Sequence, residues 1–94
     1  MNTKCNNIVS VCDDKGRYHA IRWDGTAATA DVIRQHGIYC DLGPLDTCVV
    51  CDNKMPCAAW LKNGYWVVLG IDSIVAYNLP DEVFRERFHV LALE

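Results

Sequence analysis

The sequence lacks a long apolar run and a cluster of basic residues. No stretch approaches the roughly 20 consecutive apolar residues that a membrane-spanning helix requires. The nine Lys and Arg residues are scattered singly along the chain, so the positive surface typical of nucleic-acid-binding proteins is not expected. The net charge of −3 is too small to indicate a nucleic-acid mimic. The composition therefore disfavours direct binding to nucleic acid and insertion into a membrane.

The N-terminal stretch also lacks the pattern of a secretory signal. Its short apolar patch is interrupted by Ser10 and followed by Asp13 and Asp14, whereas a signal needs an uninterrupted apolar segment and a small-residue cleavage site. A cytoplasmic, reducing location is therefore predicted. In that setting the six cysteines are expected to be mostly buried free thiols rather than disulfides.

The length and composition predict one small globular domain that spans residues 1–94. Hydrophobic residues make up 51% of the chain and charged residues 22%, which is close to the average of soluble proteins. A core of this size is small, so large aromatic side chains contribute much of its apolar area. Trp23, Trp60 and Trp66 are the first core candidates.

The pattern of apolar residues and turn residues predicts short strands and two helices. The motif "DDKG" is typical of a tight hairpin turn between two strands. Thr26 or Thr29 can cap a helix that ends before Gly37, and Pro80 suits the first turn of a second helix that continues to Leu91. Ala28, Val32 and Ile33 are expected to face the core. The predicted strands are 7–12, 17–23, 47–52, 57–61, 65–70 and 71–79.

The order β-β-α-β-β-β-β-α predicts the α+β fold class. Four consecutive short strands favour an antiparallel meander. The expected architecture is a single curved antiparallel sheet of about five to six short strands with two helices.

A zinc site is a weak alternative explanation for some of the cysteines. Cys48 and Cys51 form a C-x2-C pair, and Cys57 follows. Zinc needs about four converging ligands, and the second closely spaced pair is absent. Residues three apart on a strand also point to opposite faces, so the strand-like "TCVVCD" opposes a shared ligand. The prediction is therefore no metal and no other cofactor.

Catalysis is not predicted, because no group of residues requires it. His19, His36 and His89 stand outside any recognisable nucleophile or phosphate-loop motif. The placement of Asp13 and Asp14 is explained by their preference for turns. The placement of the two carboxylates after Pro80 is explained by their favourable interaction with the helix dipole. The sequence therefore predicts a protein that is not an enzyme and has no catalytic residues.

Short landmarks recur along most of the chain. They are Trp23, Asp24, Gly25, Gly64, Trp66, Tyr77, Pro80, Asp81 and Phe84. This pattern resembles a family of small phage and prophage proteins of unknown function, which has a Trp-x-Gly turn, a Gly-Asp-Trp-Ile/Val strand, an aromatic-containing strand and a final Pro-Asp-x-Phe helix. The chain departs from the family pattern at Tyr65, where the family has Asp, and by an extra N-terminal strand.

The resemblance implies a phage-type accessory protein that works by binding. Small phage proteins often bind host proteins stoichiometrically, and some inhibit bacterial defence complexes, as anti-CRISPR proteins do. The expected partner is therefore a host protein or protein complex. Exposed Tyr and Arg side chains are common interface anchors. The candidate partner-binding residues are Tyr65, Tyr18, Tyr39, Tyr77 and Arg22.

Two alternatives stay open from the sequence. A pocket between sheet and helices would suit a small-molecule or zinc-binding module. An uncovered edge strand would also allow two copies to pair as a homodimer across a two-fold axis.

Overall fold

The architecture was analysed in a computed structural model of the chain. The structure describes residues 8–52, 54, 58–70 and 74–93. It contains eight strands and two helices in the order β1 (Ile8–Asp13), β2 (Gly16–Arg22), α1 (Ala27–Gln35), β3 (Tyr39–Leu42), β4 (Cys48–Cys51), β5 (Ala59–Leu61), β6 (Trp66–Leu69), β7 (Val75–Leu79), α2 (Asp81–Arg87) and β8 (His89–Leu93).

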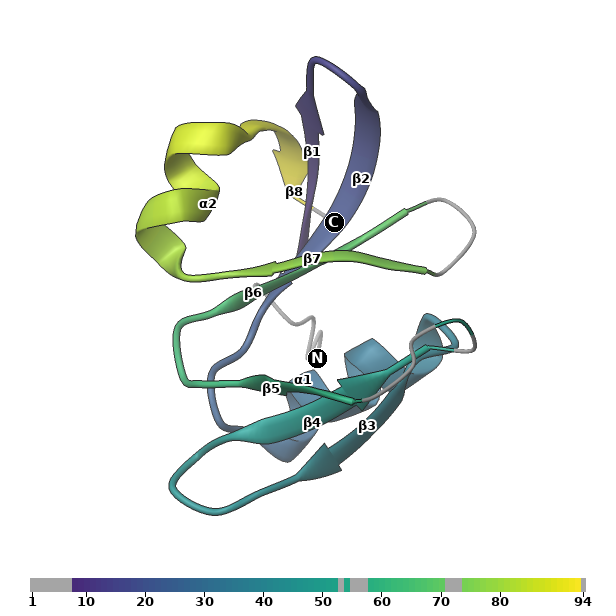
Figure 1. The fold of residues 1–94 in the computed structure, drawn as a ribbon, viewed down its shortest axis with the longest axis vertical. Helices are drawn as coiled ribbons and strands as arrows, with labels where there is room; N and C mark the ends of the chain where they lie inside the picture. Colours follow the sequence, from purple (N-terminus) through teal and green to yellow (C-terminus); the bar gives the residue numbers. More distant parts are fainter. Residues whose placement is uncertain (1–7, 53, 55–57, 71–73, 94) are drawn as a thin grey trace, which may run out of the picture.

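The strands form two antiparallel sheets rather than the single sheet expected. The larger sheet has the order β7-β6-β2-β1-β8, and the smaller has the order β3-β4-β5. Figure 1 shows the large sheet with α2 above and the small sheet with α1 below. The predicted α+β class is confirmed. The predicted meander of four consecutive strands is wrong, because β4 and β5 belong to the small sheet and β6 and β7 to the large sheet.

The meander breaks where the chain passes from β5 to β6. Gly64 has a φ of 91°, a left-handed conformation that glycine adopts without a steric penalty. Its N–H donates to the carbonyl oxygen of Trp23, and the N–H of Trp23 donates to the carbonyl oxygen of Tyr65, both at 2.8 Å. These bonds place β6 beside β2 instead of β5, so the chain changes sheets at this turn.

The C-terminal helix is shorter than predicted. It ends at Arg87, and Phe88 has extended backbone angles of −119° and 148°. Residues 89–93 then form β8, which pairs with the free edge of β1. The helical prediction up to Leu91 is wrong because the edge of β1 offers backbone hydrogen bonds to an extended segment.

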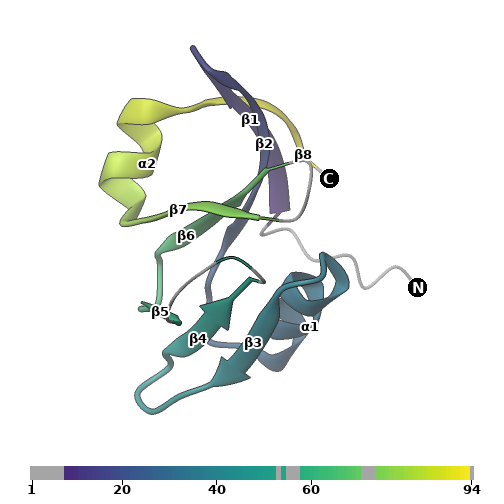
Figure 2. The same cartoon turned by 45° about the vertical axis from the view of Figure 1, so that its right-hand side comes forward.

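Two apolar cores lie on opposite faces of the large sheet (Figures 1 and 2). The first core lies between this sheet, α1 and the inner face of the small sheet. Its buried members are Ile8, Ile21, Trp23, Ala30, Ile33, Ile38, Cys40, Cys48, Val50, Leu61, Val67 and Leu69. The second core lies under α2 and contains Val9, Val11, Ala20, Trp66, Val68, Phe84 and Phe88.

Aromatic stacking and a polar anchor hold α2 on the large sheet. The rings of Trp66 and Phe84 stack with centroids 4.0 Å apart. The indole Nε1 of Trp66 donates to Oδ1 of Asp81 at 2.8 Å, and Nε of Arg85 donates to Oδ2 of the same carboxylate at 2.8 Å. Asp81 and Arg85 therefore form an i,i+4 ion pair at the start of α2.

The predicted start and end of α1 are also confirmed. The hydroxyl of Thr26 accepts from the N–H of Thr29, and Gly37 has a φ of 81° after the helix. The buried face of the helix consists of Thr29, Ala30 and Ile33. Ala28 is exposed and Val32 is half-buried, so the predicted helix face is shifted by about one position.

Candidate functional site

The small sheet has one covered face and one outer face. The inner face presents Cys40, Cys48, Val50 and Leu61, all at least 97% buried, to the first core. Side chains alternate between the two faces of a strand, so the intervening residues form the outer face. These are Tyr39, Asp41, Val49, Cys51 and Trp60.

Strand register brings the outer-face residues into two adjoining rows. Asp41 lies opposite Val49, and Val49 lies opposite Trp60, so these three form one row across the sheet. Tyr39 lies opposite Cys51 in the next row. Such cross-strand neighbours have Cβ atoms about 5 Å apart, so the rows form one continuous surface.

Two large aromatic side chains on this face are unusually exposed. Tyr39 is 58% exposed and Trp60 is 57% exposed. The sequence predicted Trp60 as a core residue, and that prediction is wrong. Leu61, its neighbour on β5, takes the buried position instead. Figures 1 and 2 show α1 on one side of the small sheet, and in the described part of the chain no helix covers the other.

A glycine next to the outer face accommodates the indole ring of Trp60. A Cβ atom added at Gly43 would lie 2.6 Å from Cζ3 of Trp60 and 2.6 Å from the hydroxyl oxygen of Thr47. Carbon atoms do not approach this closely, so Trp60 holds its position only because residue 43 has no side chain. The indole ring of Trp60 is therefore exposed to solvent but held in place by its packing against Gly43.

The hairpin between β3 and β4 presents a second exposed apolar residue. Leu45 is 94% exposed at its tip, next to Pro44. Leu45 and Asp46 have positive φ angles of 55° and 60°. Leucine rarely adopts this left-handed conformation, which costs about 1–2 kcal/mol for a residue with a Cβ atom. The tip therefore combines a strained backbone with a solvent-exposed leucine.

Hydrogen bonds fix the conformation of this tip. The N–H of Gly43 donates to the carbonyl oxygen of Thr47 at 2.9 Å, and the N–H of Thr47 donates to that of Pro44 at 3.1 Å. The indole Nε1 of the buried Trp23 donates to the carbonyl oxygen of Asp46 at 2.6 Å. The loop is thus anchored to the core, so the backbone that carries Leu45 is held in one conformation.

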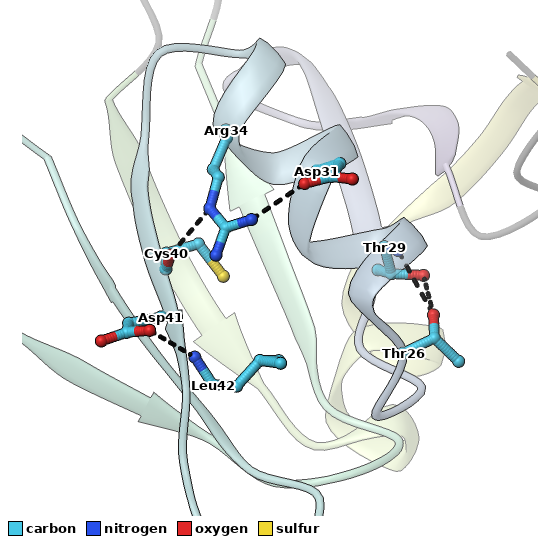
Figure 3. A network of polar contacts seen from close by, with 7 residues as sticks. All are labelled: Thr26, Thr29, Asp31, Arg34, Cys40, Asp41 and Leu42. Carbon is cyan, nitrogen blue, oxygen red and sulfur yellow. Dashed lines mark hydrogen bonds and ion pairs between the residues drawn. The ribbon is translucent and has the colours of Figure 1, made fainter.

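A hydrogen bond from helix α1 holds β3, an edge strand of the small sheet. Arg34 donates from Nε to the carbonyl oxygen of Cys40 at 2.9 Å and from Nη1 to Oδ1 of Asp31 at 2.8 Å. Figure 3 shows Arg34 between the helix and β3, with Asp41 directed away from the helix. Because β3 is fixed by this contact, the outer face rests on a rigid support.

Asp41 gives the outer face a negative charge. The hydroxyl of Tyr39 donates to Oδ2 of Asp41 at 3.3 Å, and Oδ1 accepts from the N–H of Leu42 at 3.0 Å. The negative charge of Asp41 raises the pKa of the Tyr39 hydroxyl above its ordinary value. The face therefore offers aromatic surface beside a carboxylate, which suits an apolar partner that carries a hydrogen-bond donor or a cation.

The five predicted partner-binding residues do not form one surface. Tyr39 alone lies on the outer face. Tyr18 and Tyr77 are half-buried over the second core, with ring centroids 6.2 Å apart, and each meets Phe88 edge to face. Arg87 donates to the Tyr77 hydroxyl at 3.0 Å and lies 4.2 Å from its ring centroid. Both tyrosines thus help to hold α2.

Tyr65 and Arg22 lie near the turn where the chain changes sheets. The side chain of Tyr65 is half-buried against the first core, whereas Arg22 is exposed at the end of β2. Sequence reasoning missed Trp60 and Leu45 as exposed residues. Adjacent residues on a strand point to different faces of the sheet, so Trp60 and Leu61 cannot share a face, but the sequence does not reveal which face is covered.

The cysteines of the weak zinc alternative point in different directions. Cys48 is fully buried on the inner face, whereas Cys51 is half-buried on the outer face; Cys57 lies outside the described residues. Among the residues that the structure describes, no group of three His, Cys, Asp or Glu side chains could hold a metal ion.

A different pair of thiols lies together on the inner face. Cys40 and Cys48 share a hydrogen bond that lowers the pKa of the Cys40 thiol and raises that of the Cys48 thiol. Burial also raises the pKa of Cys48. Both are free thiols within the first core.

Comparisons with protein-family models, curated proteins and solved structures find no match to this chain. The resemblance to small phage proteins therefore stays a prediction. In the described part of the chain, no helix has the length and apolar character needed to cross a bilayer.

Proposed function

We propose that this protein acts by stoichiometric binding to another protein through the outer face of the small sheet and the adjoining hairpin tip. The observation that carries the proposal is the exposure of Tyr39, Leu45 and Trp60 on a rigid support. Aromatic residues are enriched at protein interfaces, where they act as anchors in desolvated pockets.

Pre-organisation supports a binding role over a chance exposure of apolar groups. Trp60 is positioned by close packing against Gly43, and the tip that carries Leu45 is tied to Trp23. Side chains already held in place lose little conformational entropy on association. The left-handed backbone at Leu45 and Asp46 is the kind of local strain that tends to occur at functional sites.

The expected partner follows from the chemistry of the surface and from the sequence resemblance. Asp41 and Asp46 flank the apolar residues, so the partner surface is expected to combine an apolar pocket with Lys or Arg side chains. The phage-type landmarks add the expectation that the partner is a bacterial host protein in the cytoplasm, with a defence complex as the narrower candidate. Such a protein acts without catalysis.

Affinity capture with matched variants tests the proposal. Tagged wild type, the double variant Leu45→Asn/Trp60→Ala and the control Val83→Ser would each be exposed to a bacterial lysate. Val83 is 42% exposed on α2, so its change removes exposed apolar surface from a different face. We expect one host protein to be captured at a fixed ratio by the wild type and the control, and to be lost with the double variant.

Thermal unfolding of the three proteins is the accompanying control. A hot-spot aromatic residue contributes about 2 kcal/mol or more to binding, whereas removal of exposed side chains changes folding stability by well under that amount. Capture of the same proteins at the same yield by the double variant would contradict the proposal.

A further inference from the structure

Two histidine side chains meet where the end of α1 packs against the large sheet. The imidazole rings of His19 and His36 have centroids 5.7 Å apart, and their planes are tilted by 52°. His19 lies on β2, and His36 is the C-cap residue of α1. Both side chains are half-buried, so the pair lies at the rim of the first core, where solvent reaches it.

The residue pattern of each element brings the two rings to this rim. His19 precedes Ile21 by two positions on β2, and alternate residues of a strand share one face. His36 follows Ile33 by three positions at the end of α1, and residues three apart lie on one side of a helix. Ile21 and Ile33 are both fully buried in the first core. The two histidines therefore extend the same interface towards solvent.

A hydrogen bond to the backbone sets the tautomer of His36. Its Nδ1 lies 2.9 Å from the carbonyl oxygen of Val32. A carbonyl oxygen can only accept, so Nδ1 carries the proton, and in the neutral ring Nε2 carries the lone pair. Histidines that bind metals are oriented in the same way, since their second ring N–H usually donates to a backbone carbonyl or a carboxylate. His36 is thus arranged to bind a metal through Nε2.

The spacing of the two rings suits a shared metal ion. A ligating histidine nitrogen lies about 2.0–2.1 Å from zinc, and the ring centroid lies about 1.2 Å further away, so each centroid is about 3.2 Å from the metal. Two rings at a tetrahedral angle then have centroids about 5.2 Å apart. The observed separation of 5.7 Å is about 0.5 Å longer. Rotation of two half-buried side chains is sufficient to remove this difference.

From this geometry we infer that His19 and His36 form a binding site for a divalent transition metal that accepts imidazole ligands, such as Zn²⁺. No third His, Cys, Asp or Glu side chain joins them among the residues that the structure describes, so water supplies the remaining ligands. His19 uses one ring nitrogen for the metal and can keep a hydrogen bond at the other. A bound ion joins the end of α1 to β2.

The ligand set determines which cations can bind. Imidazole suits zinc, copper and nickel, whereas Mg²⁺ and Ca²⁺ need oxygen ligands such as carboxylates. Arg17 lies on the same face of β2 two positions before His19 and is exposed, so solvent screens its repulsion of a bound cation. None of the outer-face residues takes part, and the inference does not depend on the binding role proposed for that face.

Titration of the isotope-labelled full-length chain with zinc chloride tests this inference. In ¹⁵N–¹H spectra of the wild type we expect saturation at one zinc ion per chain, with the largest amide shifts around residues 19 and 36. Excess Mg²⁺ should not reverse these shifts. His19→Gln and His36→Gln are each expected to weaken binding by tenfold or more, because loss of an outer hydrogen bond to a ligand already costs about 10–100-fold in affinity.

Two matched variants control for zinc binding by other side chains. His89 is exposed on β8 and lies opposite Cys12 on β1, so these residues are a second pair of possible ligands. His89→Gln and Cys12→Ser are expected to leave the Kd for zinc unchanged. A loss of binding in either of these variants would assign the metal to that pair and overturn the inference.

Thermal unfolding gives a second readout. A metal that bridges two elements of the folded chain raises Tm, because the unfolded chain does not hold the two ligands together. Zinc is expected to raise the Tm of the wild type and of His89→Gln, and to leave that of His19→Gln and His36→Gln unchanged. Unfolding in EDTA reports whether each variant folds without metal.

The wild-type spectra decide the question even if a histidine variant fails to fold. Shifts centred away from residues 19 and 36, or no saturation at millimolar zinc, would overturn the inference. Unchanged zinc affinity in both folded histidine variants would also overturn it.

Discussion

Gly43 and Trp60 are packed so closely that any side chain at position 43 would displace the indole ring. The Cβ atom of an alanine would lie 2.6 Å from Cζ3. Gly43 does not have a positive φ, so the backbone itself tolerates alanine. The requirement for glycine here comes from the ring of Trp60 and the hydroxyl of Thr47, and it links the hairpin to the exposed face of β5.

Gly43→Ala is therefore expected to move Trp60 and to destabilise the fold modestly. Overpacking typically costs about 1–3 kcal/mol, and the cost is expected at the lower end because the displaced ring, already 57% exposed, can move towards solvent. Urea unfolding would measure the change. In the Trp60→Ala background the same substitution is expected to cost less, because the ring is gone. An equal cost in both backgrounds would show that the ring is not the obstacle.

Leu45→Asn is expected to increase stability while it decreases partner binding. Asparagine adopts the left-handed conformation at φ 55° more readily than leucine, so the free energy of unfolding should rise by roughly 0.5–1 kcal/mol. The exposed apolar anchor is lost at the same time. Thermal unfolding and capture yield measure the two effects, and a loss of stability would contradict the strain assigned to this position.

Asp81→Ala is expected to destabilise the protein at neutral pH and less so in acid. The hydrogen bond from Trp66, followed by that from Arg85, lowers the pKa of this carboxyl below its ordinary value of 3.8. A lowered pKa in the folded state means that the ionised carboxylate stabilises the fold above pH 3.8. This contribution is lost as the pH falls through the lower, folded value.

Unfolding at several pH values would measure this dependence. At pH 7 the loss of two hydrogen bonds to a charged acceptor is expected to cost about 1–3 kcal/mol, and the difference between wild type and variant should shrink below pH 3.8. Glu82→Ala serves as the control, because it removes the other carboxylate of the first helical turn. A similar pH profile for both variants would indicate a general dipole effect in place of the Trp66 anchor.

Native alkylation is expected to distinguish the cysteines by burial. Cys12 and Cys51 are half-buried, whereas Cys40 is 3% exposed and Cys48 is fully buried. Thiol reactivity requires both a thiolate and access for the reagent. Iodoacetamide should therefore modify Cys12 and Cys51 before Cys40 and Cys48, and peptide mapping by mass spectrometry would show the order. Early modification of Cys40 would mean that its lowered pKa outweighs its burial.

Local signals in the sequence correctly predicted the turns and caps. The Asp13 carboxylate accepts from the N–H groups of Lys15 and Gly16 in the β1–β2 turn, as "DDKG" predicts. Thr26 caps α1, and Gly37 ends it with a positive φ. These features depend on residues within four positions of one another, so a pattern in the sequence is sufficient to predict them.

The candidate surface could not be predicted in the same way. Strand geometry places the adjacent residues Trp60 and Leu61 on different faces of the sheet, but it does not indicate which face is buried. The tertiary packing of α1 and the large sheet against one face decides that Leu61 is buried and Trp60 exposed. The strained tip at Leu45 is equally invisible, because leucine gives no local signal for a left-handed backbone.

The α+β class, the hairpin turn and the caps of α1 could be predicted from the sequence, because each follows from short-range patterns of residues. The division into two sheets, the extended conformation of residues 89–93 and the outward position of Trp60 were set by the tertiary structure. These three outcomes depend on which strand edges and faces meet. Contacts between segments far apart in the chain decide which edges and faces meet, because these segments pair their backbone hydrogen-bonding groups and bury apolar area together.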